Sequence, residues 1–199
     1  APILAYDREQ PLELASFASA EAQVAAIADD VAYDAHDIDD GLRADLFTLE
    51  DIAAVPLVGA IVVEIDRQAP RLDPARRVHE LIRRLITRMI EEVTAESLRR
   101  LAALMPQSVA DIRAASEQVI AFSPAMQAGD KAIKGFLYPR MYRHERVMRV
   151  MDDAEQVVRD LYGHFAANPA DLPAEWGEGL NDAATRARRI ADYIAGMTD

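Results

Sequence analysis

The chain has 199 residues, a formal net charge of −12 and no cysteine, and hydrophobic residues make up 51% of it. This length is ample for one hydrophobic core, and the absence of repeats and low-complexity linkers predicts a single domain over residues 1–199. The negative charge argues against a duplex-DNA partner, which would require a basic face. No window approaches the roughly 18 apolar residues of a membrane span, so we expect a soluble protein with no membrane partner. The absence of cysteine excludes disulfides and thiolate sites and is consistent with a cytoplasmic location.

Helix signals follow one another along the whole chain. The residue mixture favours helices, capping boxes and helix-starting prolines recur, and no useful length shows the period-two alternation of a strand. After an irregular lead-in over 2–18, the predicted helices cover 21–43, 49–55, 57–68, 74–105 (with a candidate break near Thr94), 109–122, 124–138, 139–165 and 181–197. We expect an irregular segment over 168–178. The predicted fold class is therefore all-α, with six to eight helices and no sheet.

The first helix, over 21–43, combines an apolar stripe with a row of polar residues. Three- and four-residue spacing predicts that one side is buried: Val24, Ile27, Ala28, Val31, Ala32, Ala35 and Ile38. In or beside this stripe, Asp29, Tyr33 and Asp37 recur at i, i+4 and i+8, within roughly 80° around the axis and about 12 Å along it. Since unpaired carboxylates are costly to bury, this row predicts a wet cleft or a bound ligand, with ordinary surface acids and a core tyrosine as the alternative. The neighbouring acids are expected to be solvated: Asp30, Asp34, Asp39 and Asp40.

Several motifs make the chain similar to a known family. Residues 21–47 resemble the helix that carries the last metal ligand in deoxynucleoside triphosphate triphosphohydrolases of the HD superfamily, and their sequence is EAQVAAIADDVAYDAHDIDDGLRADLF. Residues 191–199 resemble the motif near the end of the same proteins, with the sequence ADYIAGMTD. Between them the family's order is followed by Phe122-Ser123, Phe136-Leu137 and Met141-Tyr142-Arg143-His144. The resemblance covers nearly the whole chain and implies an HD-superfamily-like helical bundle.

The resemblance also implies that part of the metal site is missing. In the family, the first half carries a histidine and then a His-Asp doublet that hold most of the metal. Because the chain begins at Ala1 without Met and ends within the closing motif, we expect a C-terminal portion that lacks these ligands and is inactive by itself. The doublet His36-Asp37 is not the family's doublet, because it follows the metal-ligand aspartate on the same helix.

Three residues of the first helix receive roles from the resemblance. Asp29 matches the aspartate that completes the metal site, a hard oxygen ligand suited to Mg²⁺ or Mn²⁺. Tyr33 matches the tyrosine that packs against the deoxyribose and leaves little room for a 2′-hydroxyl group. Asp37 matches the aspartate that accepts a hydrogen bond from the 3′-hydroxyl. The implied reaction is hydrolysis of a 2′-deoxynucleoside triphosphate, such as dGTP, to the deoxynucleoside and tripolyphosphate.

Arginines would meet the charge of the triphosphate, because a guanidinium group binds phosphate oxygens through paired hydrogen bonds. We expect Arg83 and Arg143 to bind the substrate. They are chosen from a larger set: Arg76, Arg77, Arg83, Arg84, Arg140, Arg143 and His144. For each of them, a solubilising or salt-bridged role is the alternative. His79 and His164 have no second ligand at metal spacing, so neither is expected to bind metal.

Two other functions stay open at this stage. The exposed helical surface suits a non-catalytic module for assembly or regulation, and a homo-oligomer is expected because the family is commonly oligomeric. An HD phosphohydrolase that acts on other nucleotides is disfavoured by Tyr33 and Asp37, which suit a deoxyribose. Metal-dependent release of tripolyphosphate by the complete protein would separate these functions.

Overall fold

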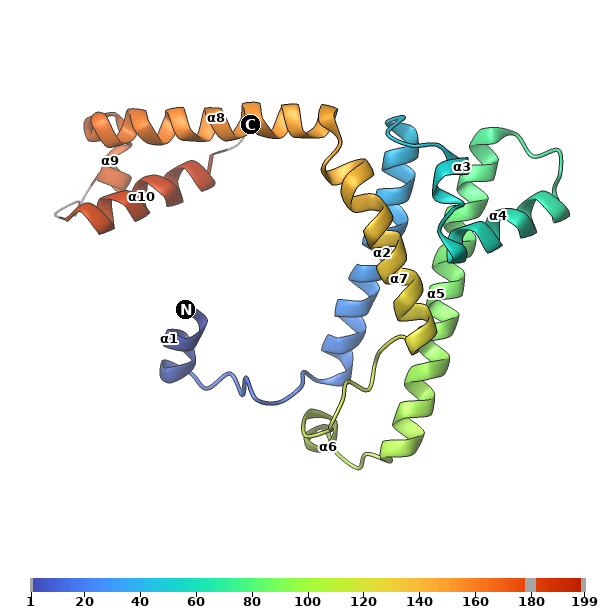
Figure 1. Ribbon diagram of the computed structural model, residues 1–199. Coiled ribbons are helices and arrows are strands. Elements are labelled where there is room, and N and C mark those ends of the chain that lie inside the picture. The colour runs from blue at the N-terminus through green and yellow to red at the C-terminus, as the bar shows by residue number, and fades with distance from the viewer. Residues whose placement is uncertain (1, 178–181, 198–199) are drawn as a thin grey trace. The chain divides into compact units, whose positions relative to one another are not determined.

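Helices dominate the computed structural model, which describes residues 2–177 and 182–197 (Figure 1). The elements in chain order are α1 (Pro2–Glu9), α2 (Ala20–Arg43), α3 (Leu49–Ile52), α4 (Pro56–Gln68), α5 (Pro74–Leu104), α6 (Val109–Arg113), α7 (Pro124–Leu137), a π-helical turn (Tyr138–Tyr142), α8 (Glu145–Ala167), a 3-10 turn (Pro169–Asp171), α9 (Ala174–Gly177) and α10 (Ala183–Ala195). No strand occurs among the described residues, which confirms the all-α fold. The described part holds ten α-helices rather than six to eight, because short helices such as α1 and α9 form where irregular chain was expected.

Local capping explains why the long helices begin where the sequence predicts. The Ser19 hydroxyl accepts a hydrogen bond from the Ala22 amide at 3.4 Å, and the Asp73 carboxylate accepts one from the Arg76 amide at 3.1 Å. These bonds satisfy amides that have no partner within the helix. α5 is continuous through Thr94, whose hydroxyl donates to the Ile90 carbonyl at 2.7 Å, so the candidate break is absent.

The helix expected over 109–122 is much shorter than predicted, because side chains from other helices bind the backbone that follows it. α6 ends at Arg113. The buried Gln23 side chain of α2 accepts hydrogen bonds from the amides of Val119 and Ile120 at 3.0 and 3.1 Å. The Ala121 amide donates to the Ser97 hydroxyl of α5 at 3.3 Å. Once these amides are satisfied outside a helix, the local helix signal is overridden.

The chain divides into two compact units, Ala1–Met141 and Tyr142–Asp199, where the sequence predicts one domain. No glycine- or serine-rich linker marks the boundary. It falls at the π-helical turn, after which the His144 imidazole caps α8 by accepting from the Arg146 amide at 3.2 Å. The predicted helix over 139–165 therefore starts at Glu145 instead.

The core of the first unit forms where α2 packs against α5 and α7, and α4 packs against α5 (Figure 1). Its fully buried side chains include Ile38, Ile52, Val58, Ile61, Ile65, Leu81, Leu85, Met89, Ile133 and Leu137. Gly41 permits one close approach, because a Cβ atom there would lie 2.2 Å from the Phe47 ring. That ring packs edge-to-face on Phe136, with centroids 5.1 Å apart.

The second unit has a small core of its own. Phe165 of α8, Leu172 and Ile190 of α10 are buried together. The Tyr193 ring packs on Phe165 at 5.2 Å between centroids. α10 begins at Ala183 after an Asp182 cap, and the predicted start at 181 lies outside the described residues.

Candidate functional site

One face of α2 brings together the three residues singled out by their spacing. Asp29 and Tyr33 are exposed, with Tyr33 61% exposed, and Asp37 is partly buried. The opposite side of α2 is fixed in the core through Val31 and Ile38. The row Asp29, Tyr33, Asp37 therefore lies on an open surface of a helix that is held rigidly from behind. We call these three residues the α2 face.

A bound divalent cation would need more ligands than the described residues provide. Within the described ranges, Asp29 and Tyr33 have no hydrogen-bond or ion-pair partner, so the Asp29 carboxylate is available to a ligand. A carboxylate oxygen suits Mg²⁺ or Mn²⁺. However, among residues 2–177 and 182–197 no group of three or more His, Cys, Asp or Glu side chains is placed to hold a metal ion. Asp29 thus fits as one ligand, while a complete site is absent from the part of the chain that is described.

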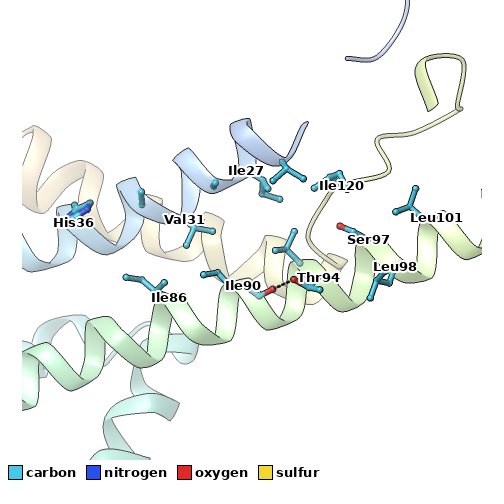
Figure 2. A pocket seen from close by; sticks show the side chains of 14 residues that line it. Ile27, Val31, His36, Ile86, Ile90, Thr94, Ser97, Leu98, Leu101 and Ile120 are labelled. Atoms are coloured by element: carbon cyan, nitrogen blue, oxygen red, sulfur yellow. Dashed lines mark hydrogen bonds between the residues drawn. The ribbon is translucent and has the colours of Figure 1, made fainter. Parts of the chain in front are cut away.

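The apolar stripe of α2 is only partly buried, contrary to prediction. Val31, Ala35 and Ile38 are buried, whereas Val24 is 49% exposed and Ala28 is exposed. The exposed part lines an apolar groove of about 510 Å³ between α2 and α5 (Figure 2). Figure 2 shows Ile27 and Val31 facing α5 and His36 at one end of the row. The lining residues are Val24, Ile27, Ala28, Val31, Ala32, His36, Ile86, Ile90, Val93, Thr94, Ser97, Leu98, Leu101 and Ile120. Its apolar lining does not suit the binding of phosphate groups.

Asp34 is the functional-looking residue that sequence reasoning missed. It was expected to be solvated, but it is 2% exposed and faces α7. Burial, and then the neighbouring carboxylate of Asp130, raise the pKa of Asp34 from its ordinary 3.8 to about 8. Lys134 lies between the acids, with its Nζ 2.8 Å from an Asp130 oxygen and 3.2 Å from an Asp30 oxygen. We call Asp30, Asp34, Asp130 and Lys134 the α2–α7 cluster.

The position of Asp34 could have been inferred from its spacing. It follows Val31 by three residues and precedes Ile38 by four, so it shares the side of α2 that these two bury. One of its oxygens, Oδ2, is buried without a hydrogen-bond partner among the described residues. A protonated carboxyl group is the less costly form at such a place, because an ionised one would be a buried charge beside another acid.

The arginines of α5 are held by acids. The Arg83 guanidinium forms a paired contact with Glu80 at 2.8 and 2.9 Å, and Arg84 binds the same carboxylate at 2.7 Å. These two partners lower the pKa of Glu80 to about 2. Arg76 pairs with Asp73, and Arg77 pairs with Asp66 and Glu50. A phosphate group at Arg83 would have to replace Glu80, so its role as a substrate ligand stays a prediction.

The arginines near the unit boundary have different surroundings. Arg140 of the first unit lies 4.6 Å above the Phe136 ring and 3.7 Å from Asp51. Arg143 belongs to the second unit, where its Nη1 is 3.7 Å from the Met148 sulfur. Its predicted contact with a triphosphate therefore also stays a prediction.

Comparison with known proteins first defines a class. Residues 120–199 match the family described as the phosphohydrolase-associated domain. This range covers α7, the π-helical turn and the whole second unit. The helical fold of the chain agrees with this assignment, and none of the helices described is both long and apolar enough to cross a membrane.

Individual relatives then extend the similarity to almost the whole chain. All three that follow are named deoxyguanosinetriphosphate triphosphohydrolase-like protein. The relative from Nitrobacter hamburgensis is 54% identical over 98% of this chain and 49% of its own length. Those from Azorhizobium caulinodans and Brucella anthropi are 51% and 48% identical over 99% and 100% of this chain, and over 50% of their own lengths. The chain thus spans about half the length of the curated relatives it matches, and the predicted resemblance to this group is confirmed.

Proposed function

We propose that this chain is part of a phosphohydrolase that cleaves 2′-deoxynucleoside triphosphates, dGTP among them, to the deoxynucleoside and tripolyphosphate. The observation that carries the proposal is the α2 face. An acid, an aromatic ring and a second acid occur at one-turn intervals on a rigid helix, and the first two are exposed. The names of the relatives, which denote resemblance to enzymes acting on deoxyguanosine triphosphate, support the same reaction class.

Each residue of the α2 face has a distinct task in this proposal. Asp29 supplies one ligand to a Mg²⁺ or Mn²⁺ ion whose other ligands come from outside the described residues. When bound, such an ion would act as a Lewis acid toward phosphate oxygens. Tyr33 stacks against the deoxyribose and disfavours a ribose, while Asp37 accepts a hydrogen bond from the 3′-hydroxyl group. Arg83 and Arg143 are the proposed contacts to the triphosphate.

The test uses the protein at the full length of its relatives, with dGTP as substrate and tripolyphosphate release as the measurement. Asp29→Asn keeps the shape of the side chain but removes its charge, so we expect a loss of at least a hundredfold in kcat/KM, because metal ligands are cooperative. Asp40→Asn is the matched control, since Asp40 is an exposed acid of the same helix and has no role in the proposal. Equal activity of the two variants would refute the role of Asp29. Absence of tripolyphosphate among the products would refute the reaction.

A further inference from the structure

α8 carries a row of apolar side chains that nothing in the second unit covers. Val150 is 67% exposed, Met151 and Val157 are each 58% exposed, and Val158 is 51% exposed. Burial occurs only toward the end of the helix, where α10 packs on Phe165. Clustered apolar side chains of this kind on a protein surface mark an interaction site. We call residues 147–158 of this row the α8 stripe.

The spacing of the α8 stripe suits another helix. Val147, Val150, Ala154 and Val157 follow one another at steps of three, four and three residues. This alternation is the pattern by which two helices pack along a shared seam. Ala154, the smallest side chain, lies near the middle and would allow the two helix axes to approach closely.

The charges of α8 indicate which helix would fit. Two ion pairs are internal to the helix, Arg149 with Glu145 and Arg159 with Glu155. Beyond these pairs, the N-terminal end of the stripe is basic and its C-terminal end is acidic. The remaining charged residues are Arg143 and Arg146 toward one end and Asp152, Asp153 and Asp160 toward the other. An antiparallel copy of the same helix brings the basic end of each against the acidic end of the other, whereas a parallel copy brings like charges together.

We propose that the α8 stripe pairs antiparallel with the same stripe of a second copy of this chain, with Ala154 at the centre. At about 100° per residue, Val150 and Val157 lie on one side of the stripe, and Met151 and Val158 lie on the other. Antiparallel pairing about Ala154 therefore places Val150 of each copy against Val157 of the other.

The same geometry places charged residues beside the seam. Arg146 of each copy lies near Asp160 of the other, which is attractive. Asp153 lies near its own counterpart, which is repulsive. The buried segment is only about 16 Å of helix, shorter than a standard interface requires, so we expect a dimer with a dissociation constant in the micromolar range.

Sedimentation equilibrium of the 199-residue chain between about 5 and 300 μM tests the pairing. The wild type should shift from monomer to dimer across this range. Val150→Asp should raise the dissociation constant by at least about tenfold, since it places a charge in the seam. Val63→Asp is the matched control, because Val63 of α4 is 68% exposed and lies in the other unit. A wild type that stays monomeric, or a dimer that Val150→Asp and Val63→Asp affect equally, would overturn the proposal. The first result is expected if another part of a longer chain covers the stripe.

Two further measurements test the orientation. The chain contains no cysteine, so single cysteines can be introduced cleanly. An oxidised mixture of Val150→Cys and Val157→Cys chains should form the mixed disulfide, whereas Val150→Cys alone should not form a dimer. The reverse result indicates parallel pairing and contradicts the proposal. Arg146→Asp should weaken the dimer, adding Asp160→Arg should restore it, and Asp153→Asn should strengthen it. A dimer unchanged by all three would also contradict this geometry.

Discussion

Replacing Asp34 by asparagine should make the stability of the first unit much less dependent on pH. Asp34 is buried, and its pKa is raised from 3.8 to about 8 by burial and by Asp130. The folded chain therefore keeps a proton that the unfolded chain releases above about pH 4. A group of this kind contributes most stability at low pH, and the contribution is lost as pH rises toward 8. Asparagine has the same shape and carries no proton to lose.

The size of the effect follows from the linkage between proton binding and folding. One proton bound by the folded chain and not by the unfolded chain changes the free energy of unfolding by about 1.4 kcal/mol per pH unit. Between pH 5 and pH 7 the wild type should thus lose up to about 2.7 kcal/mol relative to Asp34→Asn. Asp34 and Asp130 share this proton as a pair, and Lys134 offsets part of the repulsion, so a loss of about 1–2 kcal/mol is the expected result.

The assay is urea unfolding followed by circular dichroism at 222 nm, at pH 5, 6, 7 and 8. The quantity compared is the difference in unfolding free energy between variant and wild type at each pH. Asp40→Asn removes an exposed acid from the same helix and is the control, for which this difference should stay nearly constant. If the difference for Asp34→Asn is also constant from pH 5 to pH 8, Asp34 is ionised in the folded chain and the reasoning about its burial is wrong.

Three more predictions concern α2 and α7. Calorimetry on the 199-residue chain should detect no micromolar Mn²⁺ binding, and Asp29→Ala should change nothing, because one ligand does not make a site; tight binding abolished by Asp29→Ala would show a complete site. In the longer protein, Asp37→Ala should lower kcat/KM for dGTP roughly ten- to a hundredfold and remove sensitivity to the 3′-hydroxyl, and Tyr33→Ala should raise GTP turnover relative to dGTP; unchanged discrimination in both would refute the sugar-binding role. Gly41→Ala should destabilise the chain by about 1–2 kcal/mol in urea unfolding, because its Cβ would collide with a phenylalanine ring. Gly135→Ala, in open space on α7, should instead be neutral or stabilising.

Helix positions could be predicted from the sequence where their signals are local. The Asp73 cap and the proline after it determine where α5 begins, and the Thr48–Asp51 capping box forms as expected. The end of α6 could not be predicted, because it depends on Gln23 from a helix nearly a hundred residues earlier. The division into two units was also hidden, since a π-helical turn marks it without any change in composition.

The candidate site shows the same limit. Helical periodicity alone put Asp29, Tyr33 and Asp37 on one side of α2, and the structure agrees with that geometry. Periodicity did not reveal that part of the apolar stripe stays open as the groove against α5. Whether a given side of a helix is covered depends on partners that are distant in sequence or outside the described residues.

The α2 face and the α2–α7 cluster are mechanically connected, because adjacent residues of one helix cannot move independently. Tyr33 and Asp34 are neighbours that point about 100° apart, one toward solvent and the other toward α7. Ionisation of Asp34 places a second negative charge beside Asp130 and weakens the contact that holds this stretch of α2. The positions of Tyr33 and Asp37 should then become less well defined, and preorganisation of a binding face is lost when its support loosens. The proposed enzyme should therefore lose affinity for dGTP as pH rises toward 8, and Asp34→Asn should reduce that loss. If the KM for dGTP rises equally in both proteins between pH 6 and pH 8, the α2–α7 cluster does not support the α2 face.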